Sequence, residues 1–294
     1  MHFTVRLSLC ILGLLLLPLS LAAITIDGYS AATNDRFVND AAFLLAEQDL
    51  SGIGRSSDSR WATMVSNNVF ISANHLHPVV GSTVTFHLTN DPTGGTLTRT
   101  ATGGQRVGTS DLWLGVLGEP LTNAIAPIPF HTEAIASANS FNGSSLRNTE
   151  AYLVGRSAGS YSNETDVAVG QNVIDLAFNS ITAGGTTDFA IAAAYGTGSN
   201  DLPYEALLVS GDSGAPLLVM TDGGLSIAGI NWFVGEVTSG SDTYPISGFS
   251  YVGNYHQQLT DFIDLHATAI PEPKTAALLI GLAALGWRVR QQRA

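Results

Sequence analysis

The sequence predicts an all-β protein that ends in one helix. Short segments of β-branched or alternating apolar residues, such as 83–88, 151–154 and 166–178, are separated by clusters of Gly, Asn, Ser, Thr and Asp. Only residues 254–266 have helical spacing, with apolar side chains at intervals of three and four. The chain is therefore expected to form many short strands and a single C-terminal helix.

Residues 1–23 have the pattern of a secretory signal peptide. Arg6 precedes an apolar run over residues 9–17, and small residues then form a predicted cleavage site at Ala22 and Ala23. The apolar run is shorter than the ~20 residues that a membrane-spanning helix requires, which disfavours that alternative. We expect export, with the mature chain starting at Ala23 or Ile24.

The C-terminal segment, residues 270–294, combines three features. A Pro-Glu-Pro motif at 271–273 precedes a short apolar stretch over 275–287, and the chain then closes with three arginines. This arrangement resembles the PEP-CTERM sorting signal. The resemblance implies a Gram-negative bacterium, recognition by an exosortase, transient membrane contact through a short transmembrane segment, and delivery to the cell surface or beyond. A plain C-terminal anchor is the alternative.

Between these segments, residues 24–269 are enough for one two-lobed domain or two small ones. The only cysteine, Cys10, lies within the signal peptide, so the mature domain has no disulfide. The chain carries a net charge of −12, and its only lysine, Lys274, lies in the tail. An acidic field of this kind repels nucleic acid and anionic lipid, which argues against a nucleic-acid partner.

Three separated segments carry residues that suit nucleophilic catalysis. Predicted strands over 61–65 and 69–73 are followed by His75, and Asp111 opens an apolar strand that runs to residue 117. Residues 211–216 then read Gly-Asp-Ser-Gly-Ala-Pro. A serine hydroxyl needs a base to accept its proton, and a buried carboxylate holds the imidazole of such a base in the correct tautomer.

The order His75, Asp111, Ser213, with Gly-Asp-Ser-Gly around the serine, resembles the trypsin/chymotrypsin-like serine peptidases. Segments 227–232 and 248–255 resemble the strand beside the specificity pocket and the last strand of that family, so the similarity spans roughly residues 26–266. The resemblance implies two six-stranded antiparallel β-barrels and a C-terminal helix. Lobe one would cover about 24–118 and lobe two about 131–266, joined by the proline-rich residues 119–129.

The resemblance also implies roles for individual residues. His75, Asp111 and Ser213 would be the catalytic triad, and the N–H groups of Gly211 and Ser213 would form the oxyanion hole. Asp212 would pair with a newly made N-terminal ammonium, which signal-peptide cleavage before Ile24 could supply. The glycine pair that usually follows such a terminus is absent.

The pocket residues that the resemblance implies are Leu207, Asn231, Trp232 and Phe233. Leu207 stands at the floor position and is not acidic, so cleavage after Lys or Arg is not expected. Phe233 stands where the family usually has glycine, which narrows the pocket and favours small or apolar side chains. His77 forms a His-x-His pair with His75, but the proline that follows it favours a local turn residue, so no metal site and no cofactor are expected.

These observations predict a secreted or surface-sorted serine endopeptidase that hydrolyses protein or peptide substrates through an acyl-enzyme. Signal peptidase and exosortase would be its processing enzymes. The main alternative is a catalytically weak or inactive trypsin-fold binding protein of the extracellular matrix. An esterase with a nucleophile elbow is disfavoured, because Ser213 is followed by a strand and not by a helix.

Overall fold

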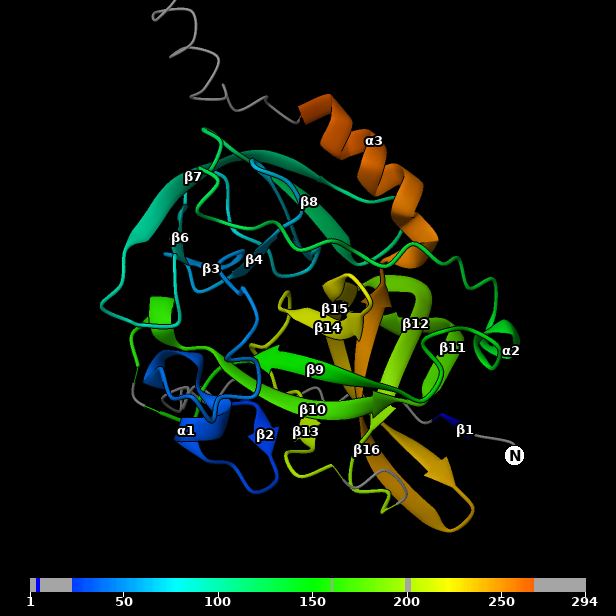
Figure 1. Cartoon of the computed structure of the whole chain (residues 1–294). Coiled ribbons are helices and arrows are strands. Elements are labelled where there is room, and N and C mark those ends of the chain that lie inside the picture. The colour runs from blue at the N-terminus through cyan, green and yellow to red at the C-terminus, as the bar shows by residue number, and fades with distance from the viewer. Residues whose placement is uncertain (1–3, 6–22, 160, 199–201, 267–294) are drawn as a thin grey trace, which may run out of the picture.

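A computed structural model describes the chain over residues 4–5, 23–159, 161–198 and 202–266. Within these residues the chain is mostly β-strand, and its longest helix is the C-terminal α3 (His256–His266). Figure 1 shows two lobes, with β3 to β8 and α3 in the upper part and the later strands below. The β-rich chain with a C-terminal helix is therefore confirmed.

The first lobe is a closed six-stranded barrel in which neighbours pair in the order β3-β4-β5-β8-β7-β6. Its interior is apolar, with Met64, Phe70 and Phe86 fully buried. Gly115 lies directly under the Phe70 ring, where an added Cβ would come within 2.0 Å of Cζ. The strands are β3 (Ile53–Ser56), β4 (Trp61–Met64), β5 (Val69–Ala73), β6 (Thr83–His87), β7 (Thr96–Arg106) and β8 (Leu112–Leu117).

The second lobe is one antiparallel sheet whose main path runs β10-β9-β14-β15-β16-β12-β11. This path has two ends, so over the described residues strand pairing does not close a second barrel. The outer edge of β10 meets other segments instead: the Gln171 N–H donates to the Tyr204 carbonyl at 2.8 Å, and Ala168 forms an isolated bridge with Asp35.

The strands of this lobe are β9 (Thr149–Gly155), β10 (Ala168–Ile174), β11 (Leu176–Ala183), β12 (Thr186–Ala194), β14 (Pro216–Thr221), β15 (Gly224–Ser239) and β16 (Asp242–Tyr251). The single strand expected over 166–178 is thus two strands. The two residues of β1 (Thr4–Val5) pair with β15 near its C-terminal end, and β13 (Ala206–Leu207) pairs with β2 (Thr25–Ile26).

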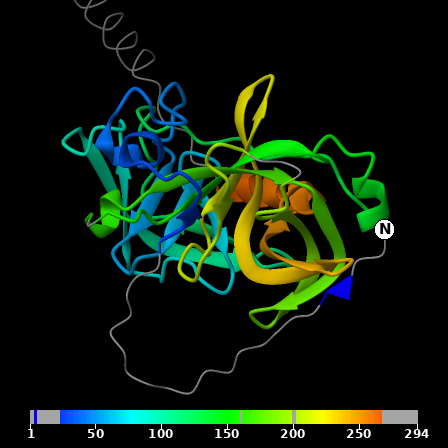
Figure 2. The same cartoon turned by 90° about the horizontal axis from the view of Figure 1, so that it is seen from below.

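The two lobes pack through a shared apolar core, and Figure 2 shows them side by side from below. Residues 119–129 contain no strand and run from one lobe to the other. The Ile128 N–H donates to the Met64 carbonyl of the barrel, and the His131 N–H donates to the Ile227 carbonyl of the sheet, both at 2.8 Å. The core members from both lobes include Trp61, Ile71, Leu112, Leu218, Ile230 and Phe262. This core fixes the relative position of the loops that carry the candidate site.

The remaining helices are short. Besides the single turns α1 (Ala31–Asn34) and α2 (Ala138–Phe141), there are the 3₁₀ turns Arg36–Val38, Asn163–Thr165 and Gly253–Tyr255. Four residues give no periodic pattern, so the sequence predicted neither α1 nor α2. Within the described residues, no helix is long and apolar enough to span a membrane. The predicted sorting tail and most of the predicted signal peptide lie outside those residues.

Candidate active site

Two neighbouring strands of the barrel bring His75 and Asp111 together. Ala73 at the end of β5 pairs with Leu112 at the start of β8. His75, which follows β5, and Asp111, which precedes β8, therefore lie at the same end of the barrel. His75 Nδ1 lies 2.6 Å from Asp111 Oδ2, and the His75 backbone N–H donates to Oδ1 at 3.1 Å. Asp111 is fully buried, whereas 24% of the His75 side chain is exposed. One imidazole nitrogen is therefore held by a buried carboxylate.

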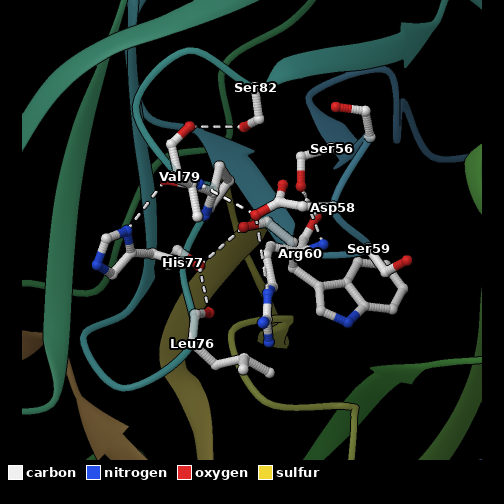
Figure 3. A network of polar contacts seen from close by, with 12 residues as sticks. Ser56, Asp58, Ser59, Arg60, Leu76, His77, Val79 and Ser82 are labelled. Atoms are coloured by element: carbon white, nitrogen blue, oxygen red, sulfur yellow. Dashed lines mark hydrogen bonds and ion pairs between the residues drawn. The ribbon is translucent and has the colours of Figure 1, made fainter.

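The segment that follows His75 is fastened to the turn between β3 and β4. The Val79 N–H donates to Asp58 at 3.2 Å, and the Ser82 hydroxyl donates to the Val79 carbonyl at 2.7 Å (Figure 3). His77 stacks on Trp113 with the ring planes 2° apart, and its Nδ1 lies 3.0 Å from the Pro78 carbonyl. The His77 ring is thus engaged with Trp113 of β8.

Ser213 lies in the tight loop before β14, between two glycines with left-handed backbone. Gly211 has φ +101° and Gly214 has φ +90°, which an L-residue adopts only with strain. An added Cβ at Gly214 would come within 2.8 Å of Ser72 Oγ and 2.9 Å of the Leu76 carbonyl. The loop that carries Ser213 therefore packs directly against the segment that carries His75.

A second glycine turn covers the imidazole from the other lobe. Gly184, between β11 and β12, has φ +55°, and an added Cβ there would lie 3.5 Å from His75 Cγ. Among the described residues, no hydrogen bond joins Ser213 Oγ to His75. A bond of this kind is often long in an enzyme without substrate and tightens when substrate binds.

The backbone of residues 211–215 leaves two N–H groups without an acceptor in the described chain. The N–H of Asp212 donates to Val209, that of Gly214 to Asn231, and that of Ala215 to Asp212. The N–H groups of Gly211 and Ser213 donate to no described residue. Two backbone donors beside a serine side chain are the arrangement that binds a developing oxyanion.

Two buried side chains hold the carbonyl groups of this loop. Arg156 Nη2 donates to the Ser210 carbonyl at 3.0 Å, and Trp61 Nε1 approaches the Gly211 carbonyl at 3.4 Å. In a trans peptide the C=O and N–H bonds point in opposite directions. Arg156, by holding the Ser210 carbonyl, therefore directs the Gly211 N–H to the opposite side of the peptide plane.

Asp212 points away from Ser213 into the protein. It is fully buried, and its two oxygens accept the N–H groups of Arg156 and Val209, each at 2.9 Å. Burial raises the pKa of this carboxyl to about 6, against the two backbone hydrogen bonds and the charges of Arg156 and Arg55, which lower it. Ile24 is also buried, packs with Asp212 on Gly155, and donates its N–H to the Arg156 carbonyl at 3.0 Å.

A pocket of about 190 Å³ opens beside Ser213. The Phe233 ring lies against Gly248, where an added Cβ would come within 2.1 Å of Phe233 Cζ. Trp232 is fixed by a hydrogen bond from Nε1 to the Ala183 carbonyl at 3.2 Å. The pocket is lined by Leu208, Val209, Ser210, Ser213, Asn231, Trp232, Phe233 and Val234.

Of the four pocket residues that the sequence suggested, three line this cavity. Leu207 does not: it lies in β13 and pairs with Thr25. The Asn231 side chain turns inward, donating to the carbonyls of Val154 at 2.8 Å and Asp212 at 3.0 Å. Asn231 therefore also anchors the loop that carries Ser213.

Sequence reasoning missed the contribution of Arg156 and Gly184. Arg156 follows β9 with no motif around it, and Gly184 belongs to an ordinary Gly-Gly turn, so only the fold reveals that they lie at the site. No protein-family model matches the chain, and no curated protein matches it either.

Proposed function

We propose that the protein is a serine endopeptidase that uses Ser213, His75 and Asp111. One observation carries the proposal: a buried carboxylate holds one imidazole nitrogen 2.6 Å away, while the adjoining serine loop offers two unengaged backbone N–H groups. In this proposal His75 is the base, Asp111 the orienting acid and Ser213 the nucleophile, beside the two backbone donors of its loop.

In the proposed reaction, Ser213 Oγ attacks the carbonyl carbon of the scissile peptide bond while His75 Nε2 accepts the hydroxyl proton. The carbonyl oxygen becomes an oxyanion that accepts the N–H groups of Gly211 and Ser213. The C–N bond then breaks as His75 returns the proton to the leaving amine, which gives an acyl-enzyme. Water, deprotonated by His75, hydrolyses the ester and restores Ser213. Asp111 stabilises the imidazolium during both acylation and deacylation.

The pocket supports a preference for small or apolar residues before the scissile bond. Its volume of about 190 Å³ is limited by Phe233, and none of the described residues that line it is acidic. A lysine or arginine side chain would therefore lose its hydration without finding a counter-ion.

The trypsin-like two-barrel fold, with its lobes at about 24–118 and 131–266, belongs to the same proposal. The closed first barrel and the meeting of His75, Asp111 and the Ser213 loop support it. Export, exosortase sorting through residues 270–294 and the cell surface of a Gram-negative bacterium rest on the terminal sequence patterns. We further propose that Asp212, buried against Ile24, orders the oxyanion loop.

Labelling with a fluorophosphonate probe tests the catalytic proposal. Protein expressed from the full chain should label, and Ser213→Ala and His75→Ala should both abolish labelling. His77→Ala is the matched control, because His77 packs on Trp113 and should leave labelling unchanged. Peptide-library hydrolysis by the labelled protein would then define the substrate.

The irregular pocket strand favours one second candidate, a catalytically weak or inactive peptidase-like binding protein of the extracellular matrix: the register of β15 against β16 shifts between Asn231 and Phe233, and the Phe233 ring lies over Gly248. Folded protein that neither labels nor hydrolyses any library peptide would support that function and overturn the first. Labelling that survives Ser213→Ala would also overturn it, because the reactive serine would then lie elsewhere.

A further inference from the structure

The edge of β15 continues outward from the proposed active site. Asn231 pairs on this side with Ala215 of the nucleophile loop, and Phe233 and Val234 line the pocket. From Trp232 to Glu236 no described strand pairs with this edge, although β16 covers the opposite edge along its length. Figure 1 shows the β15–β16 hairpin projecting below the second lobe.

Pro245 shows which backbone groups face the open edge. It pairs with Glu236, and its carbonyl accepts the Tyr195 N–H at 3.0 Å, on the side of β16 away from β15. The Glu236–Pro245 pair is therefore a non-hydrogen-bonded pair of the antiparallel ladder. In such a pair, the N–H and C=O of Glu236 point outward, and those of Val234 and Thr238 do the same because the pattern repeats every two residues.

The chain itself supplies a strand at the far end of this edge. Thr4 and Val5 pair antiparallel with Thr238 and Val237 (Figure 1). Because the pairing is antiparallel, the direction from Thr4 to Val5 is the direction along β15 toward Val234 and the pocket. A peptide laid in this direction presents its C-terminal continuation to Ser213.

The edge also lacks the features that usually block pairing. Residues 232–239 contain neither proline nor lysine, and their only charged residue is Glu236. Val234 is 51% exposed although it lies beside the pocket. An unprotected edge that is continuous with a substrate pocket suits strand addition by an extended peptide.

We propose that β15 from Val234 to Glu236 binds the substrate as an added antiparallel strand, through residues well upstream of the scissile bond. This inference rests on the proposed peptidase function and names its substrate class: polypeptide segments extended over about 20 Å, or roughly six residues, before the pocket. The outward backbone groups of Val234 and Glu236 supply the ladder hydrogen bonds, whereas Thr238 already pairs with Thr4. Globular chains whose cleavage sites lie in folded helices are excluded from this class.

The test uses protein expressed from the full chain and fluorogenic peptides that end in Ala at the scissile bond. Two, four, six or eight alternating Thr and Val residues precede that Ala. We expect kcat/KM to rise on the order of 10- to 100-fold from the shortest to the longest peptide, since each net backbone hydrogen bond contributes about 0.5–1.5 kcal/mol. When the backbone of the longest peptide is N-methylated at one residue at a time, kcat/KM should fall only for methylation at every second residue.

Glu236 offers a matched pair of variants. Glu236→Pro removes the outward N–H and should abolish most of the length dependence, whereas Glu236→Ala keeps that N–H and should retain it. Fluorophosphonate labelling and hydrolysis of the two-residue peptide should stay unchanged in both variants, which shows that they remain folded.

A flat length series in protein that labels at Ser213 would overturn this inference and leave the proposed function intact. Failure to label and to hydrolyse any peptide of the series would instead overturn the proposed function, and the inference with it. A dimer that Glu236→Pro converts to monomer, with no length dependence in either, would assign the edge to a second copy and also overturn the inference.

Discussion

The guanidinium of Arg156 donates to the carbonyl oxygen of Ser210 at 3.0 Å, three residues before the candidate nucleophile. The backbone N–H of Arg156 simultaneously donates to Asp212 at 2.9 Å. One residue at the end of β9 thus holds the loop on both sides of Gly211, whose N–H is a proposed oxyanion donor. Arg156 is buried, so these bonds are shielded from water.

Replacement of Arg156 should impair the oxyanion hole more than substrate binding. In Arg156→Met the Ser210 carbonyl loses its donor and the Gly211 peptide can rotate. We expect kcat to fall roughly 10²-fold, as for loss of one oxyanion donor, with KM changed only a few-fold. Arg156→Lys should recover part of kcat. Steady-state kinetics check this, with Arg147→Met, in the second lobe, as the control; an equal rise in KM would contradict it.

Asp111→Asn should leave the fold intact and remove most of the turnover. The amide cannot hold imidazole in the tautomer that accepts the Ser213 proton, and it does not stabilise imidazolium. We expect kcat to fall roughly 10⁴-fold. Hydrolysis of an optimised peptide and near-UV circular dichroism measure the two effects, and a folded variant with near-normal kcat would exclude Asp111 from the triad.

Gly214→Ala should inactivate the protein through crowding between the two lobes. Its Cβ would lie 2.8 Å from Ser72 Oγ, and the backbone φ of +90° adds strain. Gly224 has a similar φ of +97° with no atom within 4 Å of an added Cβ, so Gly224→Ala isolates the strain. Both variants should lose about 1 kcal/mol of stability or more, but only Gly214→Ala should lose fluorophosphonate labelling. Equal labelling in both would show that the loop tolerates the displacement.

Phe233→Ala should enlarge the pocket. The ring covers Gly248 and limits the cavity of about 190 Å³, so its removal opens space for larger side chains. We expect the ratio of kcat/KM for Phe-ending to Ala-ending substrates to rise on the order of 10-fold or more, which corresponds to roughly 1–3 kcal/mol of apolar contact. An unchanged ratio would place the specificity pocket elsewhere.

The pH dependence of stability should carry a contribution from Asp212. Its pKa is raised from 3.8 to about 6 by burial, so the folded protein keeps this proton to higher pH than the unfolded chain does. Between these two values the unfolded chain binds fewer protons, and the free energy of unfolding therefore falls as pH rises.

Urea unfolding between pH 4 and 7, compared for the parent and Asp212→Asn, checks this expectation. The variant should show a flatter dependence over that window. Asp166, Asp175 and Asp188 also have pKa values raised by burial, but they are present in both proteins and cancel in the comparison. A parent curve no steeper than that of the variant would contradict the shift.

Local sequence patterns were informative where one segment decides its own conformation. The apolar stretch over 69–73 forms β5, and the helical spacing over 254–266 corresponds to a 3₁₀ turn followed by α3. The glycines around Ser213 do take left-handed backbone, for which their lack of a Cβ suits them. These features depend on side-chain periodicity and backbone sterics, which residues close together in the sequence determine.

The features that the sequence left open depend on contacts between distant segments. Whether the second lobe closes as a barrel depends on which segment reaches the edge of β10, and residues 204–206 lie there. Leu207 lies six residues before Ser213, which is the spacing that the resemblance gives for the pocket floor. In the structure it pairs with Thr25 instead and does not line the pocket. The spacing of residues along the sequence does not reveal which distant segment a residue pairs with.

The sequence by itself determined the β-rich class, the C-terminal helix and the presence of a histidine, an aspartate and a serine at strand ends. Only the tertiary structure decided that Arg156 and Trp61 hold the carbonyls beside Ser213, that Gly184 covers His75 and that no described strand pairs with the β15 edge from Trp232 to Glu236. Periodicity and turn chemistry act over a few residues, whereas these contacts join residues from 54 to 150 positions apart and exist only after the two lobes have packed.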